Sequence, residues 1–169
     1  WLNKAQWGAV KNLVLLGFMG SGKTTVGHLA ASELGLRFVD MDRWIEEKEG
    51  AAISEIFAQK GEPDFREMEA QAVMELAAQT DLVIATGGGV GLQNSNLEVL
   101  GRSGVLIHLH VDAETVLART QRHTHRPLLQ GDDPAEKIRK LLAQLLPLYE
   151  MIPNQFNTIN RSAREICSD

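Results

Sequence analysis

The sequence contains little cysteine, few aromatic residues and no long apolar run. Cys167 is the single cysteine among 169 residues, so no internal disulfide framework can form, and we expect a reducing, cytoplasmic compartment. No stretch approaches the ~18 consecutive apolar residues of a membrane-spanning helix. The first residues carry no charged segment followed by an apolar one, so we expect no secretory signal. Because the chain begins with Trp1 and not with Met, we interpret it as a fragment or as a processed or trimmed product.

The charge balance also lacks a basic excess. Lys and Arg total 17 and Asp and Glu total 22, which gives a net charge of −5 with neutral His. Binding to nucleic acid through bulk positive charge is therefore not expected. Hydrophobic residues make up 44% and charged residues 23% of the chain, and this ordinary usage excludes a disordered or low-complexity protein. The length predicts a single domain, residues 1–169, with a core of its own.

Short apolar runs alternate with segments of helical period, which predicts an α/β fold with a parallel sheet. The expected strands are Asn12–Leu16, Arg37–Asp40, Leu82–Ala85, Val105–Leu109 and Phe156–Ile159. The expected helices are Lys23–Leu34, Phe65–Ala78, Ala113–Arg122 after an Asp112 cap, and a helix that begins at Asp133-Pro134 and ends at about Leu146, before Pro147. Residues 124–132 have no apolar period and are predicted to form a mobile loop.

A phosphate-binding motif joins the first expected strand to the first expected helix. Gly17-Phe18-Met19-Gly20-Ser21-Gly22-Lys23-Thr24 matches G-x-x-x-x-G-K-[ST] in full, in the strand–loop–helix context that the motif requires. Glycines let the backbone curl around an anion, and the helix N-terminus adds partial positive charge. Lys23 can reach the β- and γ-phosphates of a nucleoside triphosphate, and the Thr24 hydroxyl can ligate Mg²⁺. The alternative is a chance glycine-rich turn, against which the flanking strand and helix argue.

Two carboxylates, Asp40 and Asp42, follow the second expected strand. Ligands of an open parallel sheet bind outside the carboxyl ends of its strands, and residues two apart in extended chain point the same way. One carboxylate can hold Mg²⁺ through water while the other faces an acceptor hydroxyl as base or orienter. Alternatively, Asp42 caps a helix that begins at Arg43. Gly87-Gly88-Gly89 follows the strand Leu82–Ala85 and either lets a ligand approach closely or forms a flexible turn.

In their order and spacing these motifs resemble the shikimate kinase family of P-loop kinases. The resemblance covers residues 12–161 and rests on five segments: Gly17–Thr24, Asp40-Met41-Asp42, Phe65-Arg66-Glu67-Met68-Glu69, Gly87-Gly88-Gly89 and Arg126-Pro127-Leu128-Leu129. It implies a three-layer fold with a five-stranded parallel sheet, helices on both faces, an acceptor-binding subdomain around residues 43–61 and a mobile lid around residues 123–132. It further implies that ATP, with Mg²⁺, phosphorylates the 3-hydroxyl of shikimate, a step of aromatic amino-acid biosynthesis. We expect a monomer without nucleic-acid or membrane partners.

The resemblance also implies roles for individual residues. Lys23, Asp42 and Arg126 would be catalytic: Asp42 is the candidate base, and Arg126 would close with the lid onto the transferring phosphoryl group. Mg²⁺ would be held by Thr24 and Asp40. The acceptor would be bound by Asp42, Arg66, Gly87, Gly88 and Gly89, with Glu69 steadying Arg66 from one helical turn away.

ATP would be contacted by Gly20, Ser21, Gly22, Lys23, Thr24, Thr25, Arg119 and Arg126. Among these, Arg119 matches an arginine that packs near the adenine. The alternative for Arg119, Arg122 and Arg126 is a solvated cluster at a helix end, where the helix dipole favours positive charge.

One position departs from the family pattern. Family members have an arginine two residues before a Pro-Leu-Tyr sequence, where it clamps the substrate carboxylate together with the Arg66 equivalent; here Leu145 stands at this position. Leucine offers neither of the charge-assisted bonds that a guanidinium gives a carboxylate. Three alternatives follow. Shikimate is held by Arg66 alone or with Arg139 or Lys140; or the acceptor is a related polyol or cyclitol; or the domain senses a ligand without catalysis. The first alternative is favoured, because the residues for catalysis are present.

Four histidines and the cysteine complete the set of chemically interesting side chains. His108 and His110 share one face of an expected strand, and we interpret them as satisfied polar residues, with a metal pair as the alternative. His123 and His125 lie in the expected lid and are interpreted as solvated loop residues. Cys167 lies away from every motif, so no nucleophilic role is expected.

Overall fold

The centre of the sheet is the strand that leads into the phosphate-binding motif. A computed structural model of the chain describes residues 11–120 and 133–168. Its strands are β1 (Asn12–Leu16), β2 (Arg37–Asp40), β3 (Leu82–Ala85), β4 (Gly104–His110) and β5 (Asn154–Asn157). They pair in the order β2-β3-β1-β4-β5, and every pairing is parallel. The expected five-stranded parallel sheet is confirmed, and its strand order reverses beside β1, where such sheets bind ligands.

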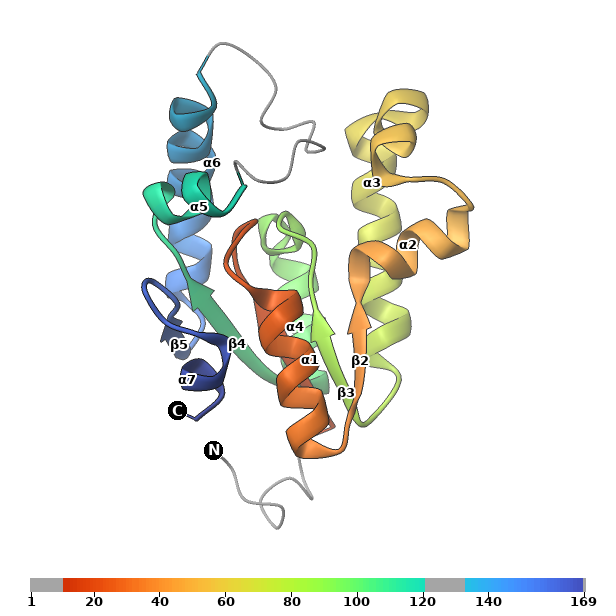
Figure 1. Ribbon diagram of the computed structural model, residues 1–169. Coiled ribbons are helices and arrows are strands. Elements are labelled where there is room, and N and C mark those ends of the chain that lie inside the picture. The colour runs from red at the N-terminus through yellow and green to blue at the C-terminus, as the bar shows by residue number, and fades with distance from the viewer. Residues whose placement is uncertain (1–10, 121–132, 169) are drawn as a thin grey trace.

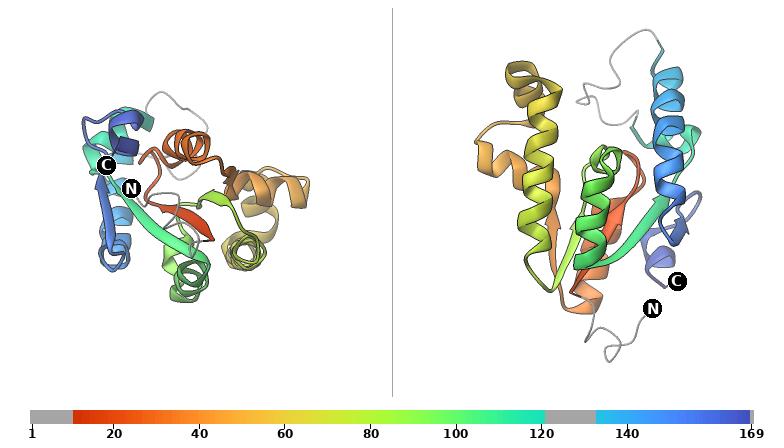
Figure 2. Two further views of the ribbon diagram at one scale, coloured as in Figure 1. Left: turned by 90° about the horizontal axis from the view of Figure 1, so that it is seen from below. Right: turned by 180° about the vertical axis from the view of Figure 1, so that it is seen from behind.

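Helices cover both faces of this sheet (Figure 1 and Figure 2). They are α1 (Lys23–Leu34), α2 (Met41–Glu49), α3 (Ile53–Ala77), the 3₁₀ helix η2 (Val90–Leu92), α4 (Asn94–Ser103), α5 (Ala113–Thr120), α6 (Pro134–Glu150) and α7 (Ala163–Ser168). Helices α2 and α3 stand on one side of the carboxyl end of the sheet, and α5 and α6 stand on the other (Figure 1). Within the described residues, no helix combines the length and the apolar character that a membrane crossing requires.

The two faces of the central strand contribute to two separate apolar clusters. Leu13 and Leu15 pack with α1 and α7, whereas Val14 and Leu16 pack with α3, α4 and α6. All four of these side chains are buried, which explains why β1 reads in the sequence as one continuous apolar run. The alternation follows from the two-residue period of a strand.

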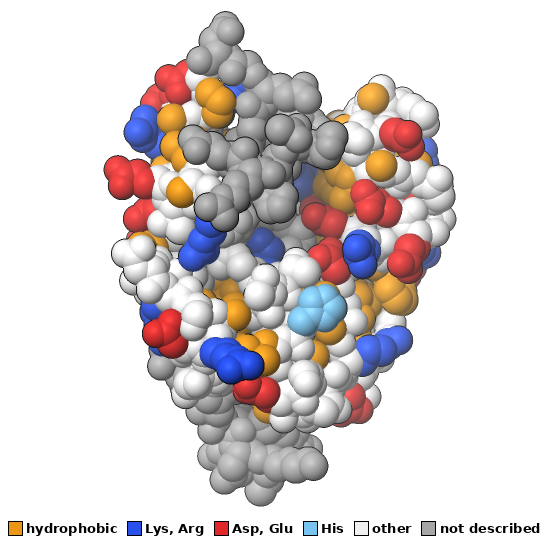
Figure 3. Space-filling view, in the orientation of Figure 1, with side chains coloured by type: hydrophobic (Ala, Val, Ile, Leu, Met, Phe, Trp, Pro, Cys, Tyr) orange, Lys and Arg blue, Asp and Glu red, His pale blue; other side chains and the backbone are white. Residues whose placement is uncertain are grey.

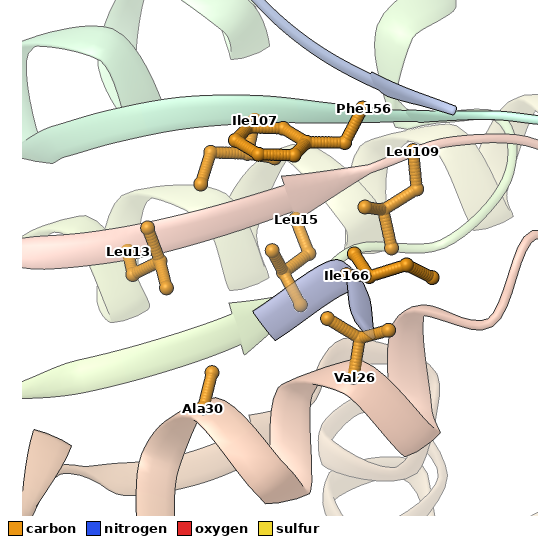
Figure 4. A pocket seen from close by; sticks show the side chains of 8 residues that line it. All are labelled: Leu13, Leu15, Val26, Ala30, Ile107, Leu109, Phe156 and Ile166. Carbon is orange, nitrogen blue, oxygen red and sulfur yellow. The ribbon is translucent and has the colours of Figure 1, made fainter. Parts of the chain in front are cut away.

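An apolar pocket lies on the α1 and α7 face of the sheet (Figure 4). It is lined by Leu13, Leu15, Val26, Ala30, Ile107, Leu109, Phe156 and Ile166. These side chains offer no hydrogen-bonding group to a ligand, so the pocket is a packing defect of the core and not a site for a charged nucleotide.

Two helices extend further than the sequence-based expectations. Helix α3 begins at Ile53 and not at Phe65. The chain is helical on both sides of Gly61, where φ is 83° and the helix bends. Helix α6 runs through Pro147 to Glu150, because burial of Leu145 and Tyr149 offsets the one backbone donor that proline lacks. These two differences show that tertiary packing overrides the local signals of Gly and Pro.

The edge strand and several short helices are also placed by tertiary contacts. Strand β5 lies two residues before the expected Phe156–Ile159, since its register is set by pairing with β4, from Ile107 opposite Asn154. Its side chains are largely exposed, so no apolar pattern marks it. Helices α4 and α7 have no counterpart among the expected helices, and α2 corresponds to the alternative helix from Arg43, although it begins at Met41. The expected extension of α5 to Arg122 and the loop 124–132 lie outside the described residues.

The buried side chain of Asn12 fixes the first residues of β1 against the chain that enters β3. Its Nδ2 donates to the carbonyl of Gln79 at 2.9 Å, and its Oδ1 accepts from the amide of Leu82 at 3.1 Å. Asn12 is fully buried, so water does not replace either bond. The side chain therefore sets the register between the central strand and its neighbour.

We predict that Asn12→Ala lowers the free energy of unfolding by about 2 kcal/mol, because it leaves the Leu82 amide buried without its acceptor. Urea denaturation measures this effect, with Asn94→Ala at an exposed position as the matched control. Equal midpoints for the two variants would contradict the assigned role of Asn12.

Candidate active site

The phosphate-binding loop curls around its own lysine. Gly20 and Gly22 have φ values of 73° and 95°, a left-handed conformation that glycine adopts without strain. Gly22 caps α1, which begins at Lys23. The Lys23 ammonium donates to the carbonyls of Gly17 at 2.7 Å and Phe18 at 3.0 Å. The loop thus presents the positive end of α1 and a lysine at the carboxyl end of β1, as phosphate binding requires.

One buried hydroxyl in this loop has no hydrogen-bond partner. Ser21 is fully buried, and its Oγ is the orphaned side-chain atom among the described residues. A Cβ added at Gly17 would lie 2.6 Å from this Oγ and 2.7 Å from the carbonyl of Leu109, so a side chain at Gly17 would displace the loop. A polar ligand at the loop would offset the cost of the unsatisfied hydroxyl.

A threonine and an aspartate provide adjacent oxygen ligands beside the loop. Thr24 donates its hydroxyl proton to Oδ2 of Asp40 at 3.2 Å. No group of three or more His, Cys, Asp or Glu side chains converges for a metal within residues 11–120 and 133–168. Mg²⁺ does not need one, since it is commonly held by one or two carboxylate or hydroxyl oxygens together with substrate phosphates and water. The Thr24 and Asp40 oxygens fit that donor set.

The aspartate that caps the following helix is Asp40 and not Asp42. Oδ1 of Asp40 accepts from the amides of Asp42 at 3.1 Å and Arg43 at 3.3 Å, which caps α2. Helix α2 begins at Met41, so Asp42 lies in the first helical turn. The expectation that both aspartates lie on extended chain is therefore wrong. The helical turn separates the two carboxylates: Asp40 faces Thr24, and Asp42 faces the glycine triplet.

The glycine triplet packs directly against three charged side chains. A Cβ added at Gly87 would lie 2.7 Å from Oδ1 of Asp42 and 2.9 Å from Oε1 of Glu69. A Cβ added at Gly89 would overlap the guanidinium of Arg66. Side chains at these two positions would push the charged groups apart, which explains why the segment is made of glycines. On the face in Figure 3, acidic and basic side chains gather where β2 meets α2.

Arg66 is held by two carboxylates of its own helix. Its Nη1 donates to Oε2 of Glu69 at 2.5 Å, and its Nε and Nη2 donate to Oε1 of Glu62 at 3.3 and 3.0 Å. Burial opposes the guanidinium charge, but the Glu69 and Glu62 carboxylates outweigh it and raise the pKa of Arg66. Burial also disfavours the charged form of Glu69 and raises the pKa of that carboxyl, and the charge of Arg66 acts against that shift. The support of Arg66 by Glu69 is as expected, and Glu62 is a second support.

Arg119 joins the phosphate loop to the segment after β5. Its Nη1 donates to the carbonyl of Gly20 at 2.9 Å and to Oγ1 of Thr158 at 3.3 Å, and its Nη2 donates to the carbonyl of Thr158 at 2.7 Å. The alternative of a solvated cluster at a helix end is thus wrong for Arg119. The expected lid lies outside the described residues, and so do four side chains in or beside it: Arg122, His123, His125 and Arg126.

The position of the departure from the family pattern is buried. Leu145 is 4% exposed and belongs to the same apolar cluster as Val90, which follows the glycine triplet. Arg139 and Lys140, the other candidate cations, are exposed on α6, within 4 Å of the Glu136 carboxylate. The structure therefore brings Arg66, and neither Arg139 nor Lys140, to the glycine triplet.

Sequence reasoning missed three polar residues that support the site. Glu62 lies four residues before Arg66 on the same helix, so the spacing of charges could have identified it. Thr158 accepts from Arg119, and Tyr149, the last residue of the Pro-Leu-Tyr sequence, donates to Gly88; no local spacing predicts either contact. Of the histidine pair, His108 is a satisfied polar residue as expected, since its ring bonds Gln155.

Comparisons with known proteins agree with this geometry. Residues 19–169 match the family described as shikimate kinase. A shikimate kinase of Thermodesulfovibrio yellowstonii is 45% identical over 141 residues, which are 83% of this chain and 82% of that protein. One of Sulfurihydrogenibium sp. is 40% identical over 160 residues, 95% of each chain.

Solved structures resemble the fold over nearly its whole length. A shikimate kinase from Acinetobacter baumannii in complex with shikimate superimposes with a TM-score of 0.91 at 40% identity, and the match covers 97% of this chain and 92% of that one. The enzyme from Aquifex aeolicus gives a TM-score of 0.82 at 30% identity, over 93% and 92% of the two chains.

Together the phosphate loop, the parallel sheet and the carboxylates at its edge define a P-loop kinase, an ATP-dependent phosphotransferase with an alcohol acceptor. Within that class, the chain belongs to the shikimate kinase family.

We predict that Glu69→Gln raises the KM for the acceptor about tenfold and leaves the KM for ATP within about twofold, because Arg66 loses its buried anionic support while the phosphate loop is untouched. Steady-state kinetics test this, with the more exposed Glu62→Gln as the matched control, for which a smaller rise is expected. Equal rises in the two KM values for Glu69→Gln would show that Glu69 acts on the fold as a whole.

Proposed function

We propose that this chain transfers the γ-phosphoryl group of ATP to the 3-hydroxyl of shikimate, with Lys23, Asp42 and Arg126 as catalytic residues. The observation that carries the proposal is the double role of Asp40, whose carboxylate accepts from Thr24 on one side and from the amide of Asp42 on the other. This connection ties the nucleotide side of the site to the acceptor side. The shikimate complex of the 40% identical relative from Acinetobacter baumannii supports shikimate as the acceptor.

The nucleotide is bound by residues of the loop and the first turn of α1. The triphosphate accepts from the loop amides, and Lys23 moves from the carbonyls of Gly17 and Phe18 to the phosphate oxygens. Thr24 and Asp40 would hold Mg²⁺, which would neutralise charge on the phosphates. Gly20, Ser21, Gly22 and Thr25 line the same loop and helix start. Arg119 supports the loop through its bond to the Gly20 carbonyl and, by its family resemblance, packs near the adenine.

The acceptor is bound by Asp42, Arg66 and the glycine triplet. Asp42 accepts a hydrogen bond from the acceptor hydroxyl and takes its proton as the oxygen attacks the γ-phosphorus. The bond from the γ-phosphorus to the β,γ-bridging oxygen breaks, and ADP is the leaving group. The close packing of Gly87 against Asp42 and of Gly89 against Arg66 supports a shared binding surface for one small molecule. Arg126 is assigned to the developing charge on the phosphoryl group by its family motif alone. The monomeric state and the cytoplasmic location expected from the sequence stay predictions.

The carboxylate of shikimate is assigned to Arg66. Three of the five guanidinium N–H groups already donate to Glu62 and Glu69, so the acceptor carboxylate shares Arg66 with two protein carboxylates. Leu145 adds no second cation. This apolar position favours the second candidate function, a kinase for a related polyol or cyclitol without a carboxylate, and an acceptor panel separates the two.

We predict that Lys23→Ala and Asp42→Asn each reduce kcat with shikimate by at least about a thousandfold, because the first removes charge stabilisation and the second the proton acceptor. A coupled ADP-release assay measures turnover, and circular dichroism checks that each variant is folded. Retained turnover in either variant would refute the assigned mechanism. Equal, slow ADP release with and without every acceptor in the wild type would instead favour a domain that senses a ligand.

We predict that Leu145→Arg lowers the KM for shikimate about tenfold, because it restores a second charge-assisted partner for the carboxylate. Leu145→Met is the matched control, since it keeps an apolar side chain of similar volume. Shikimate, quinate and neutral polyols are compared as acceptors in both variants. An unchanged or higher KM for shikimate in Leu145→Arg would mean that the carboxylate is held elsewhere.

A further inference from the structure

The single tyrosine of the chain bonds the central residue of the glycine triplet. Tyr149 lies on the buried face of α6 and is 2% exposed. Its hydroxyl donates to the carbonyl of Gly88 at 3.1 Å. Burial raises the pKa of Tyr149, so the phenol stays protonated and remains a donor. This bond connects the C-terminal half of the fold to the acceptor side of the site.

The tyrosine is held in place by contacts with His108 and Gln155. The ring stacks on His108 with centroids 4.4 Å apart and an angle of 18° between the planes. Gln155 bonds both partners: its Oε1 lies 2.5 Å from Nδ1 of His108, and its Nε2 donates to the backbone carbonyl of Tyr149 at 2.6 Å. On the other side, a Cβ added at Gly91 would lie 3.4 Å from the ring. The hydroxyl therefore approaches Gly88 from one defined direction.

The carbonyl that it bonds belongs to a segment that needs an external anchor. Three consecutive glycines have more backbone freedom than any other sequence of the same length. Gly87 and Gly89 back onto Asp42 and Arg66, and a Cβ added at Gly88 would lie 3.8 Å from the amide of Met19 in the phosphate loop. Gly88 thus lies between the two glycines of the acceptor surface and beside the phosphate loop, so its place sets how the acceptor surface faces that loop.

We propose that Tyr149 is a positioning residue for the acceptor: its hydroxyl fixes the Gly88 carbonyl and thereby sets the place of the acceptor-binding glycines relative to the phosphate loop. The proposal rests on the proposed function in taking shikimate as the acceptor. Tyr149 does not touch the reacting atoms. It acts through Gly88 on the surface where Asp42 and Arg66 receive the substrate.

Tyr149→Phe tests this, because it removes one hydroxyl and keeps the ring on His108. We expect the KM for shikimate to rise about tenfold while the KM for ATP stays within about twofold. The matched control is Ile138→Val on the same buried face of α6, which shortens a core side chain. It is expected to lower Tm and leave both KM values unchanged. An unchanged KM for shikimate in Tyr149→Phe, or the same change in both variants, would overturn the proposal.

A second measurement needs no variant. Because the chain has one tyrosine, growth with 3-fluorotyrosine gives a protein with a single ¹⁹F resonance from the position of interest. We expect saturating shikimate to shift this resonance and ADP with Mg²⁺ to leave it in place. A resonance that is unmoved by shikimate at concentrations that support turnover would overturn the proposal.

Failure of the proposed function is seen separately. The wild-type protein is assayed first with shikimate, and absence of turnover refutes shikimate as the acceptor without involving Tyr149. The acceptor from the panel that does support turnover then replaces shikimate in both experiments, with the same expected and contradicting results.

Discussion

The bond between the Thr24 hydroxyl and the Asp40 carboxylate holds the two substrate sides of this kinase together. Thr24 is in the first turn of α1, which follows β1, and Asp40 ends β2, so the bond joins segments that follow or end two strands that are not neighbours in the sheet. The same carboxylate caps α2 and so places Asp42 in its first turn. If Asp40 moved, both the proposed metal site and the proposed base would move with it. One short side chain thus relates the nucleotide to the acceptor.

The acceptor side depends on a different constraint, the absence of side chains. Glycines at 87 and 89 let Asp42, Glu69 and Arg66 converge on one stretch of backbone, and any Cβ there would separate them. Glu69 is almost fully buried, a costly place for a carboxylate, and its bond to Arg66 offsets that cost. The pair gives Arg66 a defined orientation before an acceptor arrives, so less ordering is needed when it binds.

Helix α6 contributes to this surface from the opposite side of the sheet edge. Leu145 and Tyr149 are one turn apart on its buried face, and they act in contrasting ways. Tyr149 bonds Gly88, whereas Leu145 supplies apolar surface at a position where the family pattern has a guanidinium. In the proposed function, recognition of a negatively charged acceptor therefore falls to Arg66, which also donates to Glu62 and Glu69.

The sequence by itself determined the elements that carry their own signals. The phosphate loop, the buried strands and α1 follow from apolar runs, glycine positions and a fixed spacing, which act over a few residues. The support of Arg66 by Glu69 follows from one helical turn. The tertiary structure alone decided that α6 continues past Pro147, that Asp40 meets Thr24, that Tyr149 bonds Gly88 and that Thr158 bonds Arg119. Those outcomes depend on contacts between residues up to 61 positions apart, and no local pattern encodes which distant partner offsets a lost backbone bond or completes a buried one.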